Sequence, residues 1–180
     1  MKKIMAVCGG GFRKNIDKNT IIILLITEGI ILKRIIIKSI EVDGLDATDK
    51  ILEGIEEEKV EVLIAGSIPL AGFNLINAKE IFNKKEVPSI FILEREPNIN
   101  AVKEALIKHF KDWKERLAIL EEVKINKVHT LKGEIILGIM GMKLEEAIKI
   151  IEETTIFGKT PEPLRLAKIL AKSITKIMKT

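Results

Sequence analysis

Three isoleucine-rich stretches open the chain, and their order of apolar and polar residues predicts that each is a β-strand. They cover residues 3–7, 20–27 and 32–42, and short polar turns at 15–19 and 28–29 separate them. β-Branched residues fit the half-buried surface of a sheet, and connections this short join antiparallel neighbours. The first part of the chain is therefore predicted to be a meander of three antiparallel strands.

The pattern changes from strand to helix at residues 42–49, which read VDGLDATD. Asp46 suits the N-cap of a helix, and Asp49 follows three residues later in the capping-box position. Apolar residues then recur at helical spacing as far as about residue 58, so a helix is predicted over this segment.

Two nearly continuous apolar stretches, 60–65 and 88–93, predict strands buried on both faces, with a short helix over 74–82 between them. Strand, helix, strand, helix in this order implies parallel strands joined by crossovers. Three antiparallel strands followed by a parallel β-α-β unit is the element order of an RNase H-like fold. We therefore expect an α/β protein with a mixed sheet and helices on both faces, although other α/β folds share this order.

Helical spacing dominates the remaining third of the chain. One long helix is predicted over 102–117, with His109, Phe110 and Trp113 on its apolar face. A strand or a hairpin is expected over 127–138.

Two more helices complete the prediction. One is expected over 144–151. The last is expected to have Thr160 as its cap, Pro161 at its first position and Glu162 in its first turn, and to reach about residue 178. The length suits one domain, which we expect to span residues 1–180.

Composition narrows the class of protein. Hydrophobic residues make up 47% and charged residues 31%, as in folded, soluble proteins. The chain has no apolar run near the roughly 18 residues of a membrane span and no signal-peptide core, so we expect a cytoplasmic protein without a membrane partner. One cysteine excludes an internal disulfide, and the separated His109 and His129 exclude a cysteine–histidine zinc site, which leaves carboxylates for any metal. A net charge of +4 permits a nucleic-acid partner without indicating one.

Three carboxylates, Asp43, Asp46 and Asp49, lie between the third predicted strand and the first helix. Hard cations such as Mg²⁺ prefer carboxylate oxygens, so a metal site is one interpretation. The other is structural: Asp46 and Asp49 cap the helix, and Asp43 with Gly44 makes the turn. Spacing alone favours the structural interpretation.

Two other features could bind an anion. Gly9-Gly10-Gly11 could cradle a phosphate, but a strand follows rather than a helix, so a flexible hairpin is favoured. Cys8 before the glycines is expected to pack as a small apolar residue. Arg165 and Lys168 share one face of the last helix and could contact a phosphate backbone, although solvated helix charges are the default.

Several stretches together resemble the archaeal endonuclease dU family, which is related to endonuclease V and has an RNase H-like fold. They occur in the same order as in the family, almost from end to end of the chain. They are VDGLDATD (42–49), AGFN (71–74), PSIFIL with EREPN (88–98), ALIKHFKDWKER (105–116) and PEPLRLAKILA (161–171).

The resemblance implies cleavage of DNA at deaminated bases, especially deoxyuridine, with Mg²⁺ or Mn²⁺ as the cofactor. In that fold, acidic side chains at the ends of the first and fourth strands hold metal ions that activate water and stabilise charge on the phosphate. A damaged base is also easier to flip out of the duplex. On this basis Asp43 and Asp46 are the candidate catalytic residues, with Asp43 as the candidate metal ligand. The candidate substrate-binding residues are Gly72, Phe73, Asn74 and Arg165.

This chain departs from the family at three acidic positions. Cys8-Gly9 stands where the family has an Asp-Asp pair after the first strand, Ala65-Gly66 where it has Asp-Gly after the fourth, and Asn77 where an aspartate follows GFN. Cysteine cannot replace a hard oxygen ligand for magnesium. The first hypothesis is therefore a family member that keeps the fold and a nucleic-acid surface but is catalytically impaired.

Two alternatives stay open. The chain could be an active endonuclease whose metal site is rebuilt on Asp43, Asp46 and Asp49, with Glu94 or Glu28 as a further ligand. It could instead be a non-catalytic nucleic-acid-binding module, or a structural or regulatory one. A homo-oligomer is compatible with each hypothesis.

Overall fold

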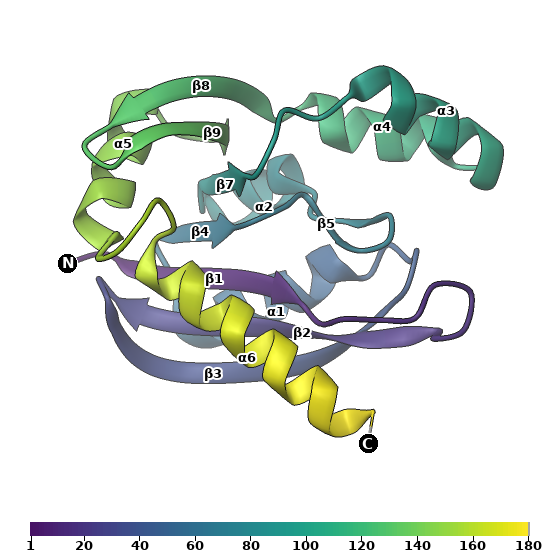
Figure 1. The fold of residues 1–180 in the computed structure, drawn as a ribbon, viewed down its shortest axis with the longest axis horizontal. Coiled ribbons are helices and arrows are strands. Elements are labelled where there is room, and N and C mark those ends of the chain that lie inside the picture. The colour runs from purple at the N-terminus through teal and green to yellow at the C-terminus, as the bar shows by residue number, and fades with distance from the viewer. Residues whose placement is uncertain (180) are drawn as a thin grey trace.

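A seven-stranded mixed sheet forms the centre of the computed structural model, which describes residues 1–179 (Figure 1). The strand order across it is β3-β2-β1-β4-β7-β9-β8. These strands are β1 (Lys3–Gly9), β2 (Asn19–Glu28), β3 (Ile31–Glu41), β4 (Val62–Ala65), β7 (Ser89–Leu93), β8 (Lys124–Thr130) and β9 (Gly133–Met140).

The pairing confirms the predicted sheet. β1, β2 and β3 form an antiparallel meander, and β4 and β7 then add parallel to β1. The region predicted as a strand or hairpin is the hairpin β8–β9, whose β9 pairs antiparallel with β7. The hairpin therefore extends the sheet beyond the parallel unit.

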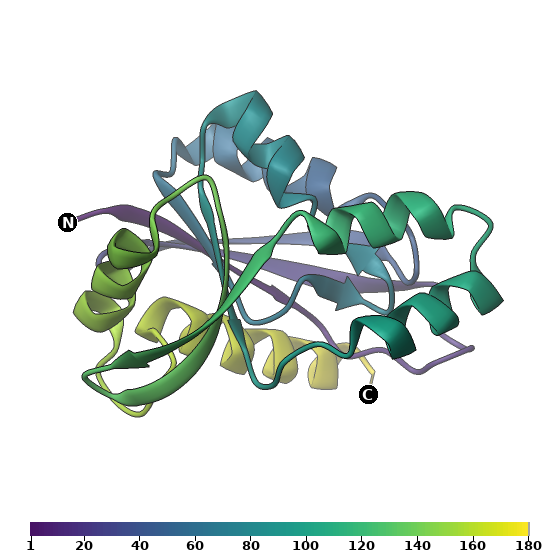
Figure 2. The ribbon, with the colours of Figure 1, turned by 90° about the horizontal axis from the view of Figure 1, so that it is seen from above.

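Helices cover both faces of the sheet, as predicted (Figure 2). α1 (Ala47–Glu58) and α2 (Ala78–Lys85) lie on one face, and α5 (Leu144–Thr154) and α6 (Glu162–Met178) lie on the other. The side chains of β1 alternate between these two layers, because successive residues of a strand point to opposite faces. Met5 and Val7 pack with α1 and α2, whereas Ala6 packs with α6.

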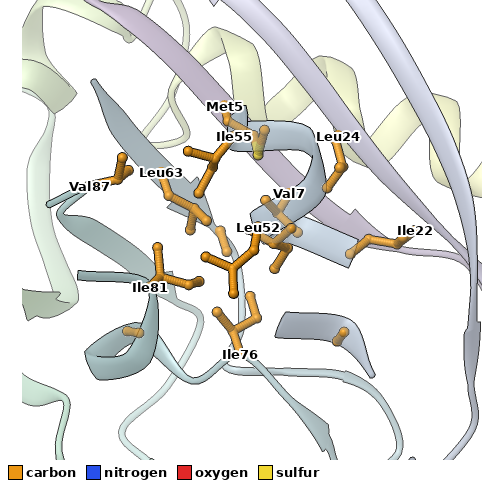
Figure 3. Close-up of a cluster of buried hydrophobic side chains, with 14 of the residues drawn as sticks. Met5, Val7, Ile22, Leu24, Leu52, Ile55, Leu63, Ile76, Ile81 and Val87 are labelled. Atoms are coloured by element: carbon orange, nitrogen blue, oxygen red, sulfur yellow. The ribbon is translucent and has the colours of Figure 1, made fainter. Parts of the chain in front are cut away.

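Apolar side chains build the core beneath α1 and α2 (Figure 3). Leu24 of β2 is fully buried there, and a Cβ atom built on Gly54 of α1 would lie 2.6 Å from the Leu24 Cδ1 atom. Glycine at this position therefore lets the helix backbone approach the sheet closely.

Two predicted helices differ from the structure. The helix predicted over 102–117 is two helices, α3 (Ile99–His109) and α4 (Trp113–Glu121), because Phe110 leaves the helical conformation at φ −131° and ψ 130°. The Phe110 ring packs edge-on against Phe73, 5.4 Å between centroids, and this long-range contact accompanies the break. His109 is exposed rather than packed, since Leu106 is the fully buried side chain of α3.

The helix predicted over 74–82 begins later. Residues Asn74–Leu75 form the strand β6, which pairs with β5 (Pro69–Ala71) in a small second sheet. α2 starts at Ala78, because the Oδ1 atom of Asn77 accepts a hydrogen bond from the Glu80 N–H group at 3.1 Å and caps the helix. None of the helices in residues 1–179 is long and apolar enough to cross a membrane.

Truncation of Leu24 tests the central core. Leu24→Ala removes a fully buried side chain beside Gly54, and we expect the free energy of unfolding to fall by about 2–5 kcal/mol. Urea denaturation measures the change. Ile107→Ala is the control, because this side chain is 51% exposed and its loss should cost less than about 0.5 kcal/mol. Equal losses in the two variants would contradict the assignment of the core.

Candidate functional site

A cavity of about 1000 Å³ opens at the carboxyl-terminal ends of β1, β4 and β7. The strand ends form one wall, and α3, α4 and the start of β8 form another. In sheets with parallel strands, ligands bind outside the carboxyl ends of the strands, so this is the expected place for a site. The strand ends contribute Val7, Cys8, Gly9, Gly66, Leu93 and Glu94 to the lining.

The lining combines an apolar interior with charged side chains that reach solvent. Phe73, Val102 and Leu120 are among the apolar residues. The charged side chains of the lining are Glu94, Arg95, Glu96, Glu121 and Lys168. Such a cavity suits a ligand with an apolar or aromatic part and polar groups near its opening.

Cys8, Gly66 and Lys168 meet at the strand ends. A Cβ atom built on Gly66 would lie 2.9 Å from the Lys168 Cε atom and 3.2 Å from its Nζ atom. The Lys168 ammonium group lies 3.9 Å from the Oε1 atom of Glu94, and the lysine side chain is 38% exposed. Burial raises the pKa of the Cys8 thiol, and the positive charge of Lys168 opposes that effect. The thiol of Cys8 and the backbone of Gly66 at the strand ends thus lie beside the ammonium group of Lys168 from α6.

Ala65 does not belong to this group. Val7 of β1 pairs with Ala65 of β4, and both side chains are fully buried in the core beneath α1 and α2. Cys8 packs on the opposite face, beside α6, and it is Gly66 that faces the same helix. A carboxylate at position 65 would therefore point into the apolar core, whereas position 66 faces the same layer as Cys8. The position beside Cys8 is Gly66.

Two of the three glycines after Cys8, Gly9 and Gly10, permit close packing. A Cβ atom on Gly9 would lie 2.2 Å from the Leu70 carbonyl oxygen, and one on Gly10 would lie 2.5 Å from Thr175 Oγ1. The Gly11 carbonyl oxygen accepts a hydrogen bond from Thr20 Oγ1 at 3.0 Å. Gly9 and Gly10 thus pack closely against β5 and α6, in the segment that leads from β1 into the β1–β2 hairpin.

The residues at the strand ends do not fit the divalent cation that the family resemblance implies. Over residues 1–179, no three His, Cys, Asp or Glu side chains are grouped closely enough to hold a metal ion. A thiol is a poor ligand for Mg²⁺, and an adjacent ammonium group repels any cation. Glu28 cannot complete the set, since it pairs with Lys3 at the opposite end of β1.

The stretches VDGLDATD and AGFN meet beside the cavity, which Phe73 lines, and together they hold a turn. The Oδ1 atom of Asp43 accepts a hydrogen bond from the Phe73 N–H group at 2.8 Å. Gly72 has φ +62°, and a Cβ atom there would lie 2.0 Å from the same Asp43 oxygen. Glycine is therefore required, and Asp43 fixes the turn between β5 and β6 to the β3–α1 connection.

Asp46 has the N-cap position of α1, but its carboxylate does not cap the helix. Its Oδ1 atom accepts hydrogen bonds from the Glu41 N–H group at 3.1 Å and from the Asn74 Nδ2 atom at 2.6 Å. The cap comes from Asn74, whose Oδ1 atom accepts from the Ala47 N–H group at 3.1 Å. The predicted capping role of the Asp46 side chain is therefore wrong, because a residue distant in sequence takes that role.

Arg116 completes this structural group and was not predicted as a site residue. Its side chain is buried, and its Nη1 atom donates to the carbonyl oxygens of Gly44 at 3.0 Å and Phe73 at 2.7 Å. The Arg116 Nε atom donates to Asp112, an interaction that lowers the pKa of that carboxyl group. Asp112 and Arg116 are four residues apart in ALIKHFKDWKER, and this spacing could have predicted their ion pair from the sequence.

The structure thus brings together five of the six predicted site residues, namely Asp43, Asp46, Gly72, Phe73 and Asn74. Of these, Phe73 also lines the cavity. Arg165 lies apart on α6 and donates two hydrogen bonds to Glu162, at 2.7 and 2.6 Å. Lys168, one turn later, is the residue of α6 that reaches the cavity. The catalytic, metal-binding and substrate-binding roles of the six residues stay predictions.

Replacement of Asn74 tests the structural group. Asn74→Ala leaves the Ala47 N–H group and the Glu41 carbonyl group without their side-chain partner, and we expect the free energy of unfolding to fall by about 2–4 kcal/mol. Chemical denaturation measures it. Asn126→Ala is the matched control, because that amide bonds only the nearby Lys124 carbonyl oxygen at the surface. A loss below about 1 kcal/mol for Asn74→Ala would contradict the structural role.

Comparisons with known proteins show which family the chain belongs to. The family model described as Endonuclease dU matches residues 2–175. A UPF0215 protein of Thermococcus sibiricus is 32% identical over 144 residues, which are 78% of this chain and 73% of that protein. A UPF0215 protein of Methanosarcina barkeri is 33% identical over 137 residues, 73% of this chain and 70% of its own.

Solved structures show the same fold. A protein of unknown function from Archaeoglobus fulgidus aligns over 97% of this chain and 98% of its own, with a TM-score of 0.83 and 23% identity. Ciona intestinalis endonuclease V, in complex with DNA containing an inosine, aligns over 98% of this chain and 87% of its own, with a TM-score of 0.63 and 11% identity. The fold is therefore the RNase H-like fold of endonuclease V, and the chain belongs to the endonuclease dU family.

Proposed function

We propose that this chain binds DNA with deaminated bases at the cavity beyond β1, β4 and β7, and that it is impaired in metal-dependent cleavage. Membership of the endonuclease dU family and the fold of endonuclease V support a nuclease-like function. The observation that supports impaired cleavage is the ammonium group of Lys168, which lies beside Cys8 and Gly66 at the strand ends.

The argument for impairment is electrostatic. Hydrolysis of a phosphodiester by bound metal ions needs carboxylates that hold the ions and offset their charge. At the strand ends this chain has a thiol whose pKa is raised by burial, so the group is uncharged at neutral pH, and it has a fixed positive charge. The remaining carboxylate there, Glu94, is paired with Lys168. No cleavage step follows from these residues.

The same residues can still contact nucleic acid. Lys168 is partly exposed at the cavity and supplies a positive charge to a phosphate without a metal ion. The apolar interior beside it suits the aromatic ring of an unstacked base, and deaminated bases leave the duplex more easily than normal ones. Binding on this proposal depends on the salt concentration and not on Mg²⁺ or Mn²⁺.

Binding and incision assays test the proposal together. With labelled duplexes that carry one deoxyuridine or one deoxyinosine, we expect no incision in Mg²⁺ or Mn²⁺. We expect binding in EDTA by fluorescence anisotropy, weakened about tenfold by Lys168→Met because one phosphate contact is lost. Lys172→Met, an exposed lysine one turn further along α6, is the control and should bind as the native chain does.

Two results would contradict the proposal. Incision by the native chain, abolished by Asp43→Asn, would favour a site rebuilt on Asp43 and Asp46. Absence of binding at low salt would favour a structural or regulatory module instead.

Restoring carboxylates tests why metal chemistry is impaired. The triple variant Cys8→Asp, Gly66→Asp, Lys168→Ala places two carboxylates on the same face and removes the lysine that a side chain at position 66 would contact. We expect it to bind Mn²⁺, seen as loss of the electron paramagnetic resonance signal of free Mn²⁺, whereas the native chain does not. The control Cys8→Asp, Ala65→Asp, with its second carboxylate in the core, should be destabilised without gaining Mn²⁺ binding. Equal Mn²⁺ binding by the native chain would overturn the explanation.

A further inference from the structure

The hairpin of β5 and β6 places an aromatic ring at the cavity. Ala71 pairs with Asn74, so Gly72 and Phe73 form a two-residue turn, and the φ of +62° at Gly72 suits the first position of such a turn. Ala71 and Asn74 are fully buried, whereas Phe73 is half-buried. Of the described residues 1–179, Phe73 is the one aromatic residue in the lining of this cavity.

Hydrogen bonds from other segments fix the backbone on both sides of this ring. Asp43 donates its N–H group to the Ala71 carbonyl oxygen at 2.9 Å, and its Oδ1 atom accepts from the Phe73 N–H group at 2.8 Å. The Phe73 carbonyl oxygen accepts from the Arg116 Nη1 atom at 2.7 Å. Both backbone groups of Phe73 are therefore bonded, and the turn cannot rotate without breaking these bonds.

Arg116 holds this turn from a buried position. Its side chain is 5% exposed, and removal of a guanidinium group from water costs free energy unless the charge is paired. Here Asp112 pairs with the charge, and the carbonyl oxygens of Gly44 and Phe73 accept the remaining bonds. Because β6 also contacts α4, the hairpin below that helix in Figure 1 is attached to it by both packing and hydrogen bonds.

The ring of Phe73 is restrained as well as its backbone. Phe110 packs against it edge-on, with 5.4 Å between the centroids and 72° between the planes. The Arg116 guanidinium carbon lies 4.3 Å from the centroid of the Phe110 ring, so one arginine contacts both the Phe73 backbone and the neighbouring ring. No aromatic ring of residues 1–179 stacks face to face on Phe73. A planar ligand in the cavity can therefore do so.

We propose that Phe73 is the surface on which an unstacked base of the DNA stacks, and that Asp43, Phe110 and Arg116 are positioning residues for its ring. This inference rests on the proposed function, since it concerns the same cavity and the same ligand. Proteins commonly bind unstacked bases by stacking them on aromatic side chains, and a ring that is already fixed loses little conformational entropy when the base binds.

Phe73 and Lys168 then have separate effects on binding. Lys168 attracts the phosphates of any DNA, whatever its bases. Phe73 contacts only a base that has left the duplex, and deaminated bases leave more easily than normal ones. The preference for deaminated over normal DNA therefore depends on Phe73, whereas affinity for normal DNA does not.

Fluorescence anisotropy with two labelled duplexes tests this separation. One carries a deoxyuridine opposite guanine and the other the normal cytosine. We expect Phe73→Leu, which keeps an apolar side chain but loses the ring, to bind the deoxyuridine duplex about tenfold more weakly and the normal duplex unchanged. Phe73→Tyr keeps the ring and should keep the preference. Phe82→Leu is the matched control, because Phe82 is a half-buried residue of α2 outside the cavity lining.

The outcomes separate this inference from the function on which it rests. Equal affinity of the native chain for the two duplexes would overturn both the proposed recognition of deaminated bases and the stacking role. A native preference that survives in Phe73→Leu would overturn the stacking role alone. Thermal melting followed by circular dichroism confirms that each variant is folded at the assay temperature.

The positioning role of Arg116 has its own readout. Lysine at this position keeps the charge but lacks the planar guanidinium group that bonds Asp112 and two carbonyl oxygens together. We expect Arg116→Lys to lower the preference for the deoxyuridine duplex at least threefold, whereas a purely structural loss would weaken binding of both duplexes alike and would contradict the role. Arg34→Lys, at an arginine paired with α1, is the control and should keep the native preference.

Discussion

The central position of β1 constrains most of this structure. β1 pairs with β2 on one side and with β4 on the other, and it is buried on both faces. Because its side chains alternate strictly, every residue of β1 and of the paired β4 is committed to one of two layers. Val7 and Ala65 belong to the core beneath α1 and α2, and Cys8 belongs to the layer of α6. The identity of the side chains at the strand ends, rather than the fold, then decides the chemistry available in the cavity.

The most distinctive stretches of the sequence serve the architecture. VDGLDATD and AGFN meet through Asp43, Asp46 and Asn74, and Arg116 ties α4 to the same turns. These groups satisfy backbone N–H and C=O groups that a buried irregular segment would otherwise leave unpaired. A stretch that identifies a family can therefore have a structural role in holding loops together, and the acids within it need not bind a metal.

Much of the fold could be predicted from the sequence, because apolar periodicity reports burial directly. The meander, the parallel unit and helices on both faces follow from it. The break at Phe110 and the capping of α1 by Asn74 could not, since both depend on partners far away in the chain. The same limit applies to the site, because an all-apolar strand such as β4 does not reveal which residues share a face with Cys8. The structure places Gly66 beside Cys8 and Ala65 in the core.

The proposed loss of cleavage has a consequence for how the cavity would recognise DNA. A divalent cation at the strand ends attracts phosphate only when it is bound, so its effect varies with the free metal concentration. The ammonium group of Lys168 is covalently part of α6, and its charge is present at every metal concentration. Such a group is a single charge without the geometry that orients an attacking water, so it can hold a phosphate but cannot by itself promote hydrolysis. A lysine beside Cys8 and Gly66 is thus consistent with a nuclease fold that retains attraction for the backbone of DNA while the chemistry is lost.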